Sequence, residues 1–361
     1  MCRVAGLAEC LDAWDMLARQ CAEPNPFYES WYLRPSLECL GAGRSVRLLC
    51  VEAGGRLIGL LPLVHQRRYY GRPIPNLSNW VHDNCFLGVP MIAAGMERLF
   101  WRALLDWADA HCGAAVFLHL RAMPLASPVT DALIEACGEQ DREIALVHRE
   151  ERALLRSDLS PGAYFDAALS GKKRKELRRQ AARLGELGDL RFIRQRDAEG
   201  ISPWCEAFLG LEQSGWKGRA GSALLCATET AALFRRTVAG AARRDKLERL
   251  TLTLNGHPIA MLASFLAPPG AFSFKTAYDE DYARFSPGVL LQRENLAMLE
   301  DPDIAWTDSC AAADHPMIDH IWRERRAIGR FSVAIGGSIR QRLFHMLAAR
   351  ERKADPGGYI S

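Results

Sequence analysis

The sequence of 361 residues has no long apolar segment and no signal-peptide pattern near its first residue. The apolar run from Leu57 to Val64, for example, is eight residues long and includes a glycine and a proline, whereas a membrane-spanning helix needs about 20 apolar residues. The first ten residues place an acidic residue where a signal peptide needs an apolar core. We therefore expect a cytoplasmic protein without a membrane span.

The sequence also lacks any regular spacing of cysteines. Its 11 cysteines are an odd number, they are scattered, and no two of them are separated by two residues. A disulfide framework would need paired cysteines, and a zinc site would need closely spaced ligand pairs. We expect reduced thiols and no bound metal.

The composition predicts a globular protein with a large core. Hydrophobic residues make up 49% of the chain and charged residues 25%, and a chain of this length usually divides into two units. We predict an N-terminal unit over residues 1–160, a second unit over residues 161–345 and a flexible tail over residues 346–361.

Two similar hairpins indicate an internal duplication. Each joins two apolar strands by a turn that contains glycine, Gly54-Gly55 in the first half and Asn255-Gly256 in the second. Glycine and asparagine tolerate the positive φ of a two-residue hairpin turn. A helix and a short strand follow each hairpin, so we infer a duplicated α/β unit, although two hairpins also resemble each other by chance. The hairpin strands are predicted over residues 47–52, 57–64, 250–254 and 259–266, and the short strands over residues 115–120 and 304–308.

The stretch from Phe272 to Leu299 predicts a strand, a polar connection and a helix. Phe272 and Phe274 alternate as in a half-buried strand, and Pro287 suits the first helical turn because it has no N–H to leave unpaired. Free backbone N–H groups at this helix N-terminus favour a bound phosphate, although an ordinary capped helix explains the same residues. The predicted phosphate-binding residues are Arg284, Ser286, Gly288, Val289 and Leu290.

A strongly basic helix is predicted after Ser170. Ten of the 46 basic residues and three of the 43 acidic residues lie between Gly171 and Arg196, so the rest of the chain is net acidic. Cations at a helix N-terminus are disfavoured by the helix dipole, which suggests an anionic partner such as a nucleotide pyrophosphate, a tRNA backbone or an anionic glycan. A solvated basic face without a partner is the alternative. The predicted contacts are Lys172, Arg174 and Arg178.

A glycine-rich loop follows a predicted helix that ends near Gly215. Such loops often form a pocket wall, so Trp216 and Lys217 are predicted substrate contacts, although an isolated tryptophan is more often a hydrophobic plug. Lys275 ends the strand before the phosphate turn and is predicted to contact a carboxylate or a phosphate.

A polar cluster follows the short strand that ends at Asp308. Cys310 and His315 lie within a few residues of this acid, and side chains at strand ends often form sites. A Cys–His hydrolase is one interpretation. We prefer Asp308 as a general base towards an amine, with His315 orienting it, because nothing indicates an oxyanion loop. Hydrogen bonds from both side chains to the loop backbone are the simplest alternative.

In their order along the chain, these features resemble the GNAT acyltransferase superfamily. The features are the basic helix, residues 212–221, the Asn255-Gly256 hairpin, residues 278–288 and Asp308. The branch that looks most similar is the one around the cellulose-biosynthesis protein CelD, which is similar to the FemABX peptidyltransferases and the leucyl/phenylalanyl-tRNA protein transferases. The resemblance implies an α/β fold with a mixed sheet, in tandem GNAT-like units with a central cleft, the first unit being degenerate.

The resemblance also implies acyl-CoA as co-substrate, bound where a strand splays from its neighbour. In the Fem-like and tRNA-dependent relatives the donor is an aminoacyl-tRNA, which the basic helix would serve equally well. We predict an acyl-CoA-dependent N-acyltransferase for a small-molecule or glycan amine, in which Asp308 or Glu212 removes the amine proton and Tyr278 or Tyr282 protonates the leaving thiolate. The alternatives are an aminoacyl-tRNA-dependent transferase and a catalytically silent module that binds polysaccharide or nucleic acid.

Overall fold

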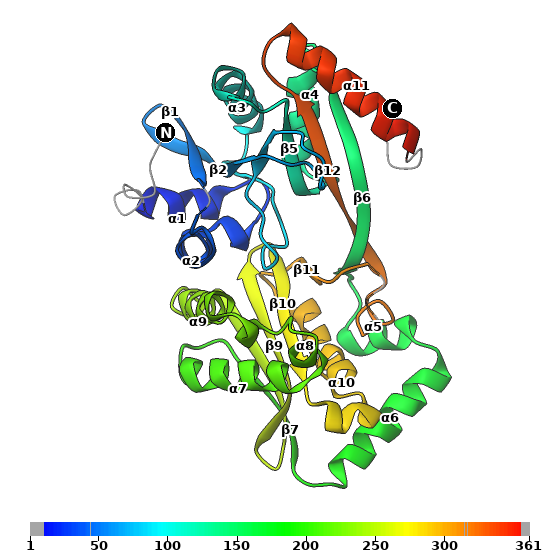
Figure 1. The fold of residues 1–361 in the computed structure, drawn as a ribbon. Helices are drawn as coiled ribbons and strands as arrows, with labels where there is room; N and C mark the ends of the chain where they lie inside the picture. Colours follow the sequence, from blue (N-terminus) through cyan, green and yellow to red (C-terminus); the bar gives the residue numbers. More distant parts are fainter. Residues whose placement is uncertain (1–10, 44, 314, 316, 355–361) are drawn as a thin grey trace. The chain divides into compact units, whose positions relative to one another are not determined.

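The computed structural model describes residues 11–43, 45–313, 315 and 317–354. The chain divides into two units (Figure 1). Unit 1 comprises Met1–Leu37, Gly41–Glu151 and Ala327–Ser361, and unit 2 comprises Glu38–Leu40 and Arg152–Arg326. This division assigns residues 327–345 to unit 1, whereas the sequence predicts them in the second unit; strand β12 (Glu324–Ala334), where they begin, pairs with β5 (Phe117–Pro124) of unit 1. The predicted tail is helical as far as Ala354.

Unit 1 consists of a mixed sheet and five helices in the described part of the chain. The helices are α1 (Leu11–Gln20), α2 (Ser30–Leu40), α3 (Glu97–His111), α4 (Pro128–Glu139) and α11 (Ser338–Ala354). The strands are β1 (Arg47–Ala53), β2 (Arg56–Gln66), β3 (Asn76–Asn79), β4 (Met91–Ile92), β5 (Phe117–Pro124), β6 (Ile144–Leu155) and β12 (Glu324–Ala334). Their order is β1-β2-β3-β5-β12-β6, with β4 paired to β2. The ends of β6 and β12 continue into unit 2.

Unit 2 has a second set of strands in the order β6-β11-β10-β9-β8-β7. The new strands are β7 (Leu190–Gln195), β8 (Leu247–Leu254), β9 (His257–Ala267), β10 (Gly270–Tyr278) and β11 (Trp306–Asp308). The helices are α5 (Pro161–Ala168), α6 (Gly171–Gly185), α7 (Ile201–Ser214), α8 (Trp216–Arg219), α9 (Thr228–Ala242) and α10 (Pro287–Asn295), with 3₁₀ turns η3 (Leu224–Cys226), η4 (Glu280–Phe285) and η5 (Leu296–Glu300). The mixed α/β architecture that the sequence predicts is confirmed.

The two units repeat the same topology. In each, three antiparallel strands are followed by a helix and then by a strand that runs parallel to the third: β1, β2, β3, α3 and β5 in unit 1, and β8, β9, β10, α10 and β11 in unit 2. The parallel pairs place His119 opposite Ser78 in unit 1 and Asp308 opposite Phe272 in unit 2. His119 and Asp308 therefore occupy corresponding strands, and the predicted tandem arrangement is confirmed.

Both predicted hairpin turns form as the residue types require. The two central residues have positive φ in each turn, 58° and 73° at Gly54 and Gly55 and 51° and 79° at Asn255 and Gly256. This backbone shape matches the right-handed twist of the paired strands. The residue types of both turns are therefore compatible with the two-residue hairpins that form.

The basic helix α6 is attached to unit 2 by the apolar face that its sequence pattern predicts. Leu177 is buried in a cluster with Phe165 and Trp322, and Leu184 in a cluster with Leu250 and further residues of β8, β9 and α10. The burial of this face leaves the charged residues of α6 exposed.

A fork opens between β10 and β11 in unit 2. The two strands pair over three positions, from Gly270 with Trp306 to Phe272 with Asp308, and β10 then continues to Tyr278 without β11 beside it. The pairing of β10 with β9 is irregular between Ser273 and Lys275, and such bulges redirect a strand.

Among the described residues, no helix is long and apolar enough to cross a membrane.

Candidate functional site

Asp308, the predicted general base, ends β11 at the fork and is fully buried. Its Oδ2 accepts hydrogen bonds from Arg152 on β6 at 2.6 Å and from Arg326 on β12 at 2.9 Å, and its Oδ1 accepts one from the backbone N–H of Cys310 at 2.9 Å. The guanidinium of Arg326 also lies 4.5 Å from the ring centroid of Trp306. One buried carboxylate thus links three strands of unit 2.

These partners make Asp308 a weak base. Burial by itself would raise the pKa of Asp308, but the charges of Arg152 and Arg326 lower it below its ordinary value. A carboxylate with a lowered pKa that two guanidiniums already hold accepts a proton poorly, so the geometry favours an ion-pair role over the predicted catalytic one. Burial also raises the pKa of the Cys310 thiol, which argues against a Cys–His hydrolase because a thiol nucleophile must ionise.

The turn before α10 does not offer the N–H groups that the sequence predicts. Ser286 adopts a left-handed conformation, with φ 55° and ψ 51°, and its carbonyl oxygen accepts hydrogen bonds from Val289 N–H at 2.9 Å and Leu290 N–H at 3.0 Å. The prediction of free N–H groups at Val289 and Leu290 is therefore wrong. Leu290 closes the first turn of the helix, and Val289 closes a tighter 3₁₀ turn to the same oxygen. At most the Gly288 N–H remains for a phosphate.

Gly288 is covered by side chains of unit 2. A Cβ atom built at Gly288 would lie 2.7 Å from Sδ of Met317 and 3.4 Å from Cδ1 of Tyr278. Tyr278 ends β10, and Met317 lies on the segment that follows β11. The absence of a side chain at Gly288 therefore accommodates the side chains of Met317 and Tyr278, which is a structural reason for a glycine at this position.

His315 lies on the same segment and interacts with Lys217. Burial lowers the pKa of His315 below its ordinary 6.5; Asp319 opposes this shift and Lys217 adds to it. The imidazole is consequently neutral at pH 7 and able to accept a proton. Lys217 in turn donates to Oε1 of the buried Glu212 at 2.8 Å, and Oε2 of Glu212 accepts from Leu224 N–H at 2.8 Å. The structure thus brings Glu212, Lys217 and His315 into one part of unit 2.

The remaining predicted residues are more dispersed. Trp216 is 54% exposed, so it is not a hydrophobic plug, and its backbone N–H donates to Oε1 of Glu280 at 2.6 Å. Lys275 lies over the Phe274 ring, with Nζ 5.7 Å from its centroid. Arg284 is exposed and stacks on Phe285, with 4.7 Å between the guanidinium carbon and the ring centroid.

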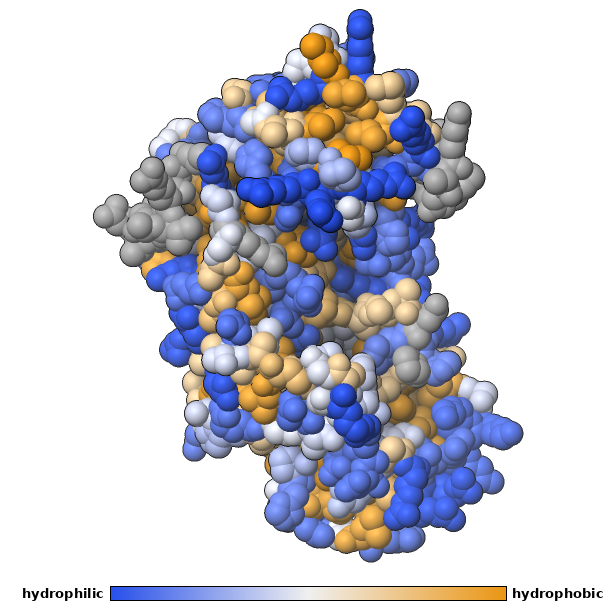
Figure 2. Space-filling view, viewed as in Figure 1, coloured by the Kyte–Doolittle hydropathy of each residue, from blue (hydrophilic) through white to orange (hydrophobic). Residues whose placement is uncertain are grey.

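Helix α6 presents a row of cations. Ser170 caps the helix as predicted, with its Oγ accepting from Lys173 N–H at 3.3 Å. Arg174 folds back and donates to the backbone oxygens of Asp166 and Leu169 near the end of α5, so it stabilises the α5–α6 connection and is not available as the predicted ligand contact. Five further cations are exposed and have no acidic partner within the described ranges: Lys172, Lys175, Arg178, Arg179 and Arg183. Figure 2 shows the hydrophilic surface over this helix, at the lower right of the view.

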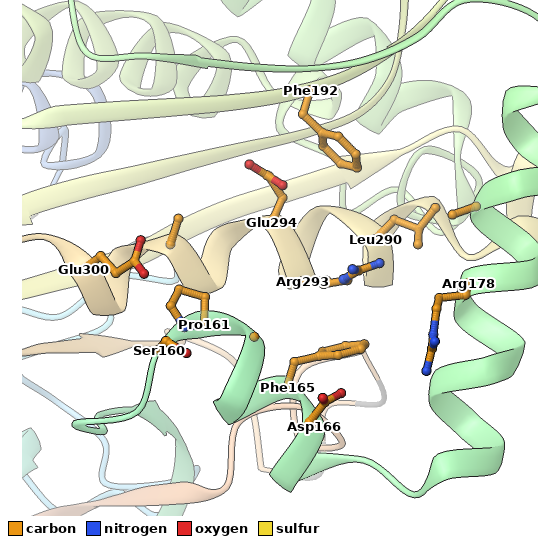
Figure 3. A pocket seen from close by; sticks show the side chains of 13 residues that line it. Ser160, Pro161, Phe165, Asp166, Arg178, Phe192, Leu290, Arg293, Glu294 and Glu300 are labelled. Carbon is orange, nitrogen blue, oxygen red and sulfur yellow. The ribbon is translucent and has the colours of Figure 1, made fainter.

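A pocket of about 740 Å³ lies between α5, α6, α10 and β7 (Figure 3). Phe165 and Phe192 provide aromatic surface, and Leu290 and Ala181 provide aliphatic surface. The charged lining residues are Arg178, Arg293, Asp166, Glu294 and Glu300. Because Arg178 belongs both to this pocket and to the α6 row, the pocket and the row form one continuous candidate binding surface.

Sequence reasoning missed several residues of these two sites. Arg152 lies 156 positions from Asp308 in the chain, and no local pattern distinguishes this arginine from its charged neighbours in β6 as the partner of so distant an acid. Phe192 does carry a signal, because it is a large apolar residue flanked by Arg191 and Arg194 in a strand whose central residues are exposed. In the described part of the chain, no group of three or more His, Cys, Asp or Glu residues has an arrangement that could hold a metal ion.

The chain is similar to one protein family in sequence and to several solved structures in fold. Residues 171–316 match the model of a family described as an acetyltransferase (GNAT) domain. No curated protein matches the chain. A crystal structure of FemX is similar, with a TM-score of 0.59 and 10% identity over 94% of this chain and 98% of that chain. The C-terminal domain of a putative lysylphosphatidylglycerol synthetase from Agrobacterium fabrum has a TM-score of 0.57 and 12% identity over 94% of this chain and 96% of that chain.

A third similar structure is a conserved protein of unknown function from Bacteroides thetaiotaomicron VPI-5482, with a TM-score of 0.54 and 10% identity over 90% of this chain and 97% of that chain. At such low identities the structural likeness establishes the fold, and the family match identifies the domain. Residues 171–316 therefore match an acetyltransferase (GNAT) family, in a chain that has the fold of FemX.

Proposed function

We propose that unit 2 transfers an acyl group from a tRNA-borne donor to an amine, at the fork between β10 and β11. The observation that carries the choice of donor is the row of unpaired cations on α6. Lys172 and Arg183, the ends of the row, are separated by about 16 Å at 1.5 Å per residue. That length spans a few consecutive phosphates of one nucleic-acid strand.

The start of α10 supports the same choice. In an acyl-CoA enzyme of this superfamily, the resemblance implies that the pyrophosphate lies on the turn at Gly288. Here Val289 and Leu290 donate to Ser286, and Met317 lies against Gly288. An aminoacyl-tRNA carries no pyrophosphate and does not need this turn.

The proposed reaction forms one amide bond. The amine nitrogen attacks the donor carbonyl carbon, the C–N bond forms, and the ester C–O bond to the tRNA ribose breaks. His315 takes the proton from the attacking nitrogen, and Tyr278 donates a proton to the ribose oxygen, which leaves as a hydroxyl group. His315 replaces Asp308 as the proposed base because its lowered pKa keeps it neutral at pH 7. The rate should therefore rise with pH and reach its plateau with a midpoint below pH 6.5.

Acyl-CoA is the second candidate donor. It is favoured by the match of residues 171–316 to an acetyltransferase family. In this alternative a thioester C–S bond breaks, the residues at the fork keep their proposed roles, and the pyrophosphate has to bind away from the closed turn at Gly288. The acceptor in both cases is an amine, as the sequence predicts.

The test compares both donors with the purified full-length protein. Transfer of a labelled acyl group to a panel of amines is measured with aminoacyl-tRNA and with acetyl-CoA. The variant Lys175→Gln/Arg179→Gln removes two members of the α6 row. Its matched control, Arg235→Gln/Arg236→Gln, removes two exposed arginines of α9 that are paired with Glu206 and Glu38.

We expect turnover with aminoacyl-tRNA, and we expect the α6 variant to reduce the slope of log affinity against log salt by about 1.4 to 1.8, whereas the α9 variant leaves it unchanged. Turnover with acetyl-CoA and none with aminoacyl-tRNA would refute the tRNA donor and support the second candidate. RNA binding without transfer from either donor would refute the enzymatic proposal.

A further inference from the structure

The pocket beside α6 has an aromatic side chain that the fold leaves available. Phe192 lies on β7, the edge strand of unit 2, and is 42% exposed although it lines the pocket. Figure 3 shows its ring directed into the pocket above α10. A large exposed aromatic side chain in a concave site offers a stacking surface for a planar ligand.

The pocket has charges of both signs, with Arg178 and Arg293 available to an anionic group and Asp166, Glu294 and Glu300 available to hydrogen-bond donors. Arg293 lies over the ring of Phe165, with the guanidinium carbon 5.0 Å from the ring centroid, and neither Arg293 nor Arg178 has an acidic partner in the part of the chain that the structure describes. Glu294, from the same helix as Arg293, adds a carboxylate that can accept hydrogen bonds from amino or hydroxyl groups. An aromatic wall, two available cations and an acceptor are the groups that recognise a nucleotide.

We propose that this pocket binds the terminal adenosine of the acyl donor, with the adenine stacked on Phe192 and phosphates held by Arg178 and Arg293. The proposal rests on the proposed function, because aminoacyl-tRNA ends in adenosine, as does the carrier portion of acyl-CoA. Arg178 joins the pocket to the α6 row, so a strand whose last base lies on Phe192 has its preceding phosphates along α6. The volume of about 740 Å³ is ample for one nucleoside and its phosphates.

The neighbouring residue on β7 provides a matched control. Ile193 is 40% exposed, is also a large apolar residue and does not line the pocket, because successive side chains of a strand point to opposite faces. Phe192→Ala and Ile193→Ala therefore remove similar exposed apolar surface from opposite faces of the same strand, and any general effect on folding appears in both.

The experiment measures binding of a fluorescent RNA hairpin with a single-stranded 3′ end to the full-length protein. The 3′-terminal nucleotide is either adenosine or an abasic residue. We expect Phe192→Ala to weaken binding of the adenosine hairpin by about 5- to 150-fold, and Ile193→Ala to leave it within about twofold. The abasic hairpin should bind the wild-type protein as weakly as the adenosine hairpin binds Phe192→Ala, with no further loss in the variant.

Competition by adenosine 3′,5′-bisphosphate, a probe for the carrier portion of acyl-CoA, identifies the source of the nucleotide. Displacement of the hairpin supports the pocket and extends it to acyl-CoA, whereas no displacement supports a pocket for the RNA end. Equal weakening by Phe192→Ala and Ile193→Ala, or equal binding of the two hairpins, would overturn the proposal.

Acyl transfer measured on the same proteins separates this inference from the proposed function. If the adenosine hairpin binds through Phe192 but no acyl group is transferred from either donor, adenosine binding in the pocket is supported and the proposed acyl transfer is refuted. If acyl transfer proceeds and Phe192→Ala leaves both hairpin binding and KM for the donor unchanged, the proposed function is supported and adenosine binding in the pocket is refuted.

Discussion

Replacing Asp308 with asparagine removes the negative charge that two buried guanidiniums share. The Oδ2 atom of Asp308 lies 2.6 Å from Arg152 and 2.9 Å from Arg326, and the side chains of the two arginines are 5% and 11% exposed. Removing one partner of a buried ion pair costs about 3–5 kcal/mol, because the remaining charge is held away from water. Asp308 pairs with two arginines, but an asparagine oxygen can still accept a hydrogen bond from one of them. We therefore expect Asp308→Asn to lower the free energy of unfolding by about 3–5 kcal/mol, the cost of one broken pair and not of two.

The assay is thermal unfolding of the full-length protein, followed by calorimetry. For a unit of this size, about 3–5 kcal/mol corresponds to a decrease in Tm of roughly 6–20 °C in the transition of unit 2. Asp189→Asn is the control, because Asp189 of unit 2 pairs with Arg191 at 2.7 Å while both side chains are more than half exposed. An exposed pair contributes at most about 1 kcal/mol, so the control should shift Tm by a few degrees at most.

A third variant tests the physical reason for the cost. Arg152→Met/Asp308→Leu/Arg326→Met replaces all three charges with apolar side chains, and such replacements of buried ion pairs are often neutral or stabilising. We expect this variant to be more stable than Asp308→Asn. The reasoning would be refuted if Asp308→Asn unfolded like the wild type, or if it kept the wild-type Tm and lost turnover, which is the result that a catalytic Asp308 requires.

Two further predictions concern single positions. Burial lowers the pKa of His119 to about 3, below its ordinary value of 6.5. Between these two pH values the unfolded chain binds a proton at His119, whereas the folded chain does not. Stability should decrease by about 1.4 kcal/mol for each pH unit below 6.5, and His119→Gln should remove that component in urea unfolding at pH 7 and pH 5; an unchanged pH dependence would contradict it. Gly288→Ala should change the free energy of unfolding by less than about 1 kcal/mol, because the crowded atom is Sδ near the end of the flexible Met317 side chain and alanine is the better helix former. A loss of more than about 3 kcal/mol in urea unfolding would show that the Met317 side chain cannot move aside.

Local features of this chain were predictable because each depends on residues that are close in sequence. The Gly54-Gly55 and Asn255-Gly256 turns need positive φ, which these residue types allow, and both turns form as predicted. The capping of α6 by Ser170 and the burial of its Leu177 and Leu184 follow from the helical period. The repeated order of hairpin, helix and short strand could be read for the same reason, whereas the parallel pairing of that strand could not.

The candidate site was predictable only in part. Glu212, Lys217 and His315 were identified individually from loops and strand ends, and the structure brings them together in unit 2. The predicted amides at Val289 and Leu290 failed because a sequence pattern does not show which oxygen a backbone N–H will reach. That depends on the left-handed conformation of Ser286.

The sequence by itself determined the kind of elements, their turns and the charge of α6, since propensity, period and capping act over a few residues. The tertiary structure alone decided that Arg152 and Arg326 reach Asp308, that Met317 covers Gly288, and that Phe192 faces a pocket. These contacts depend on which strands become neighbours and which loop passes over a helix end. Many chain paths are compatible with the same local pattern, and packing of the whole core selects one of them.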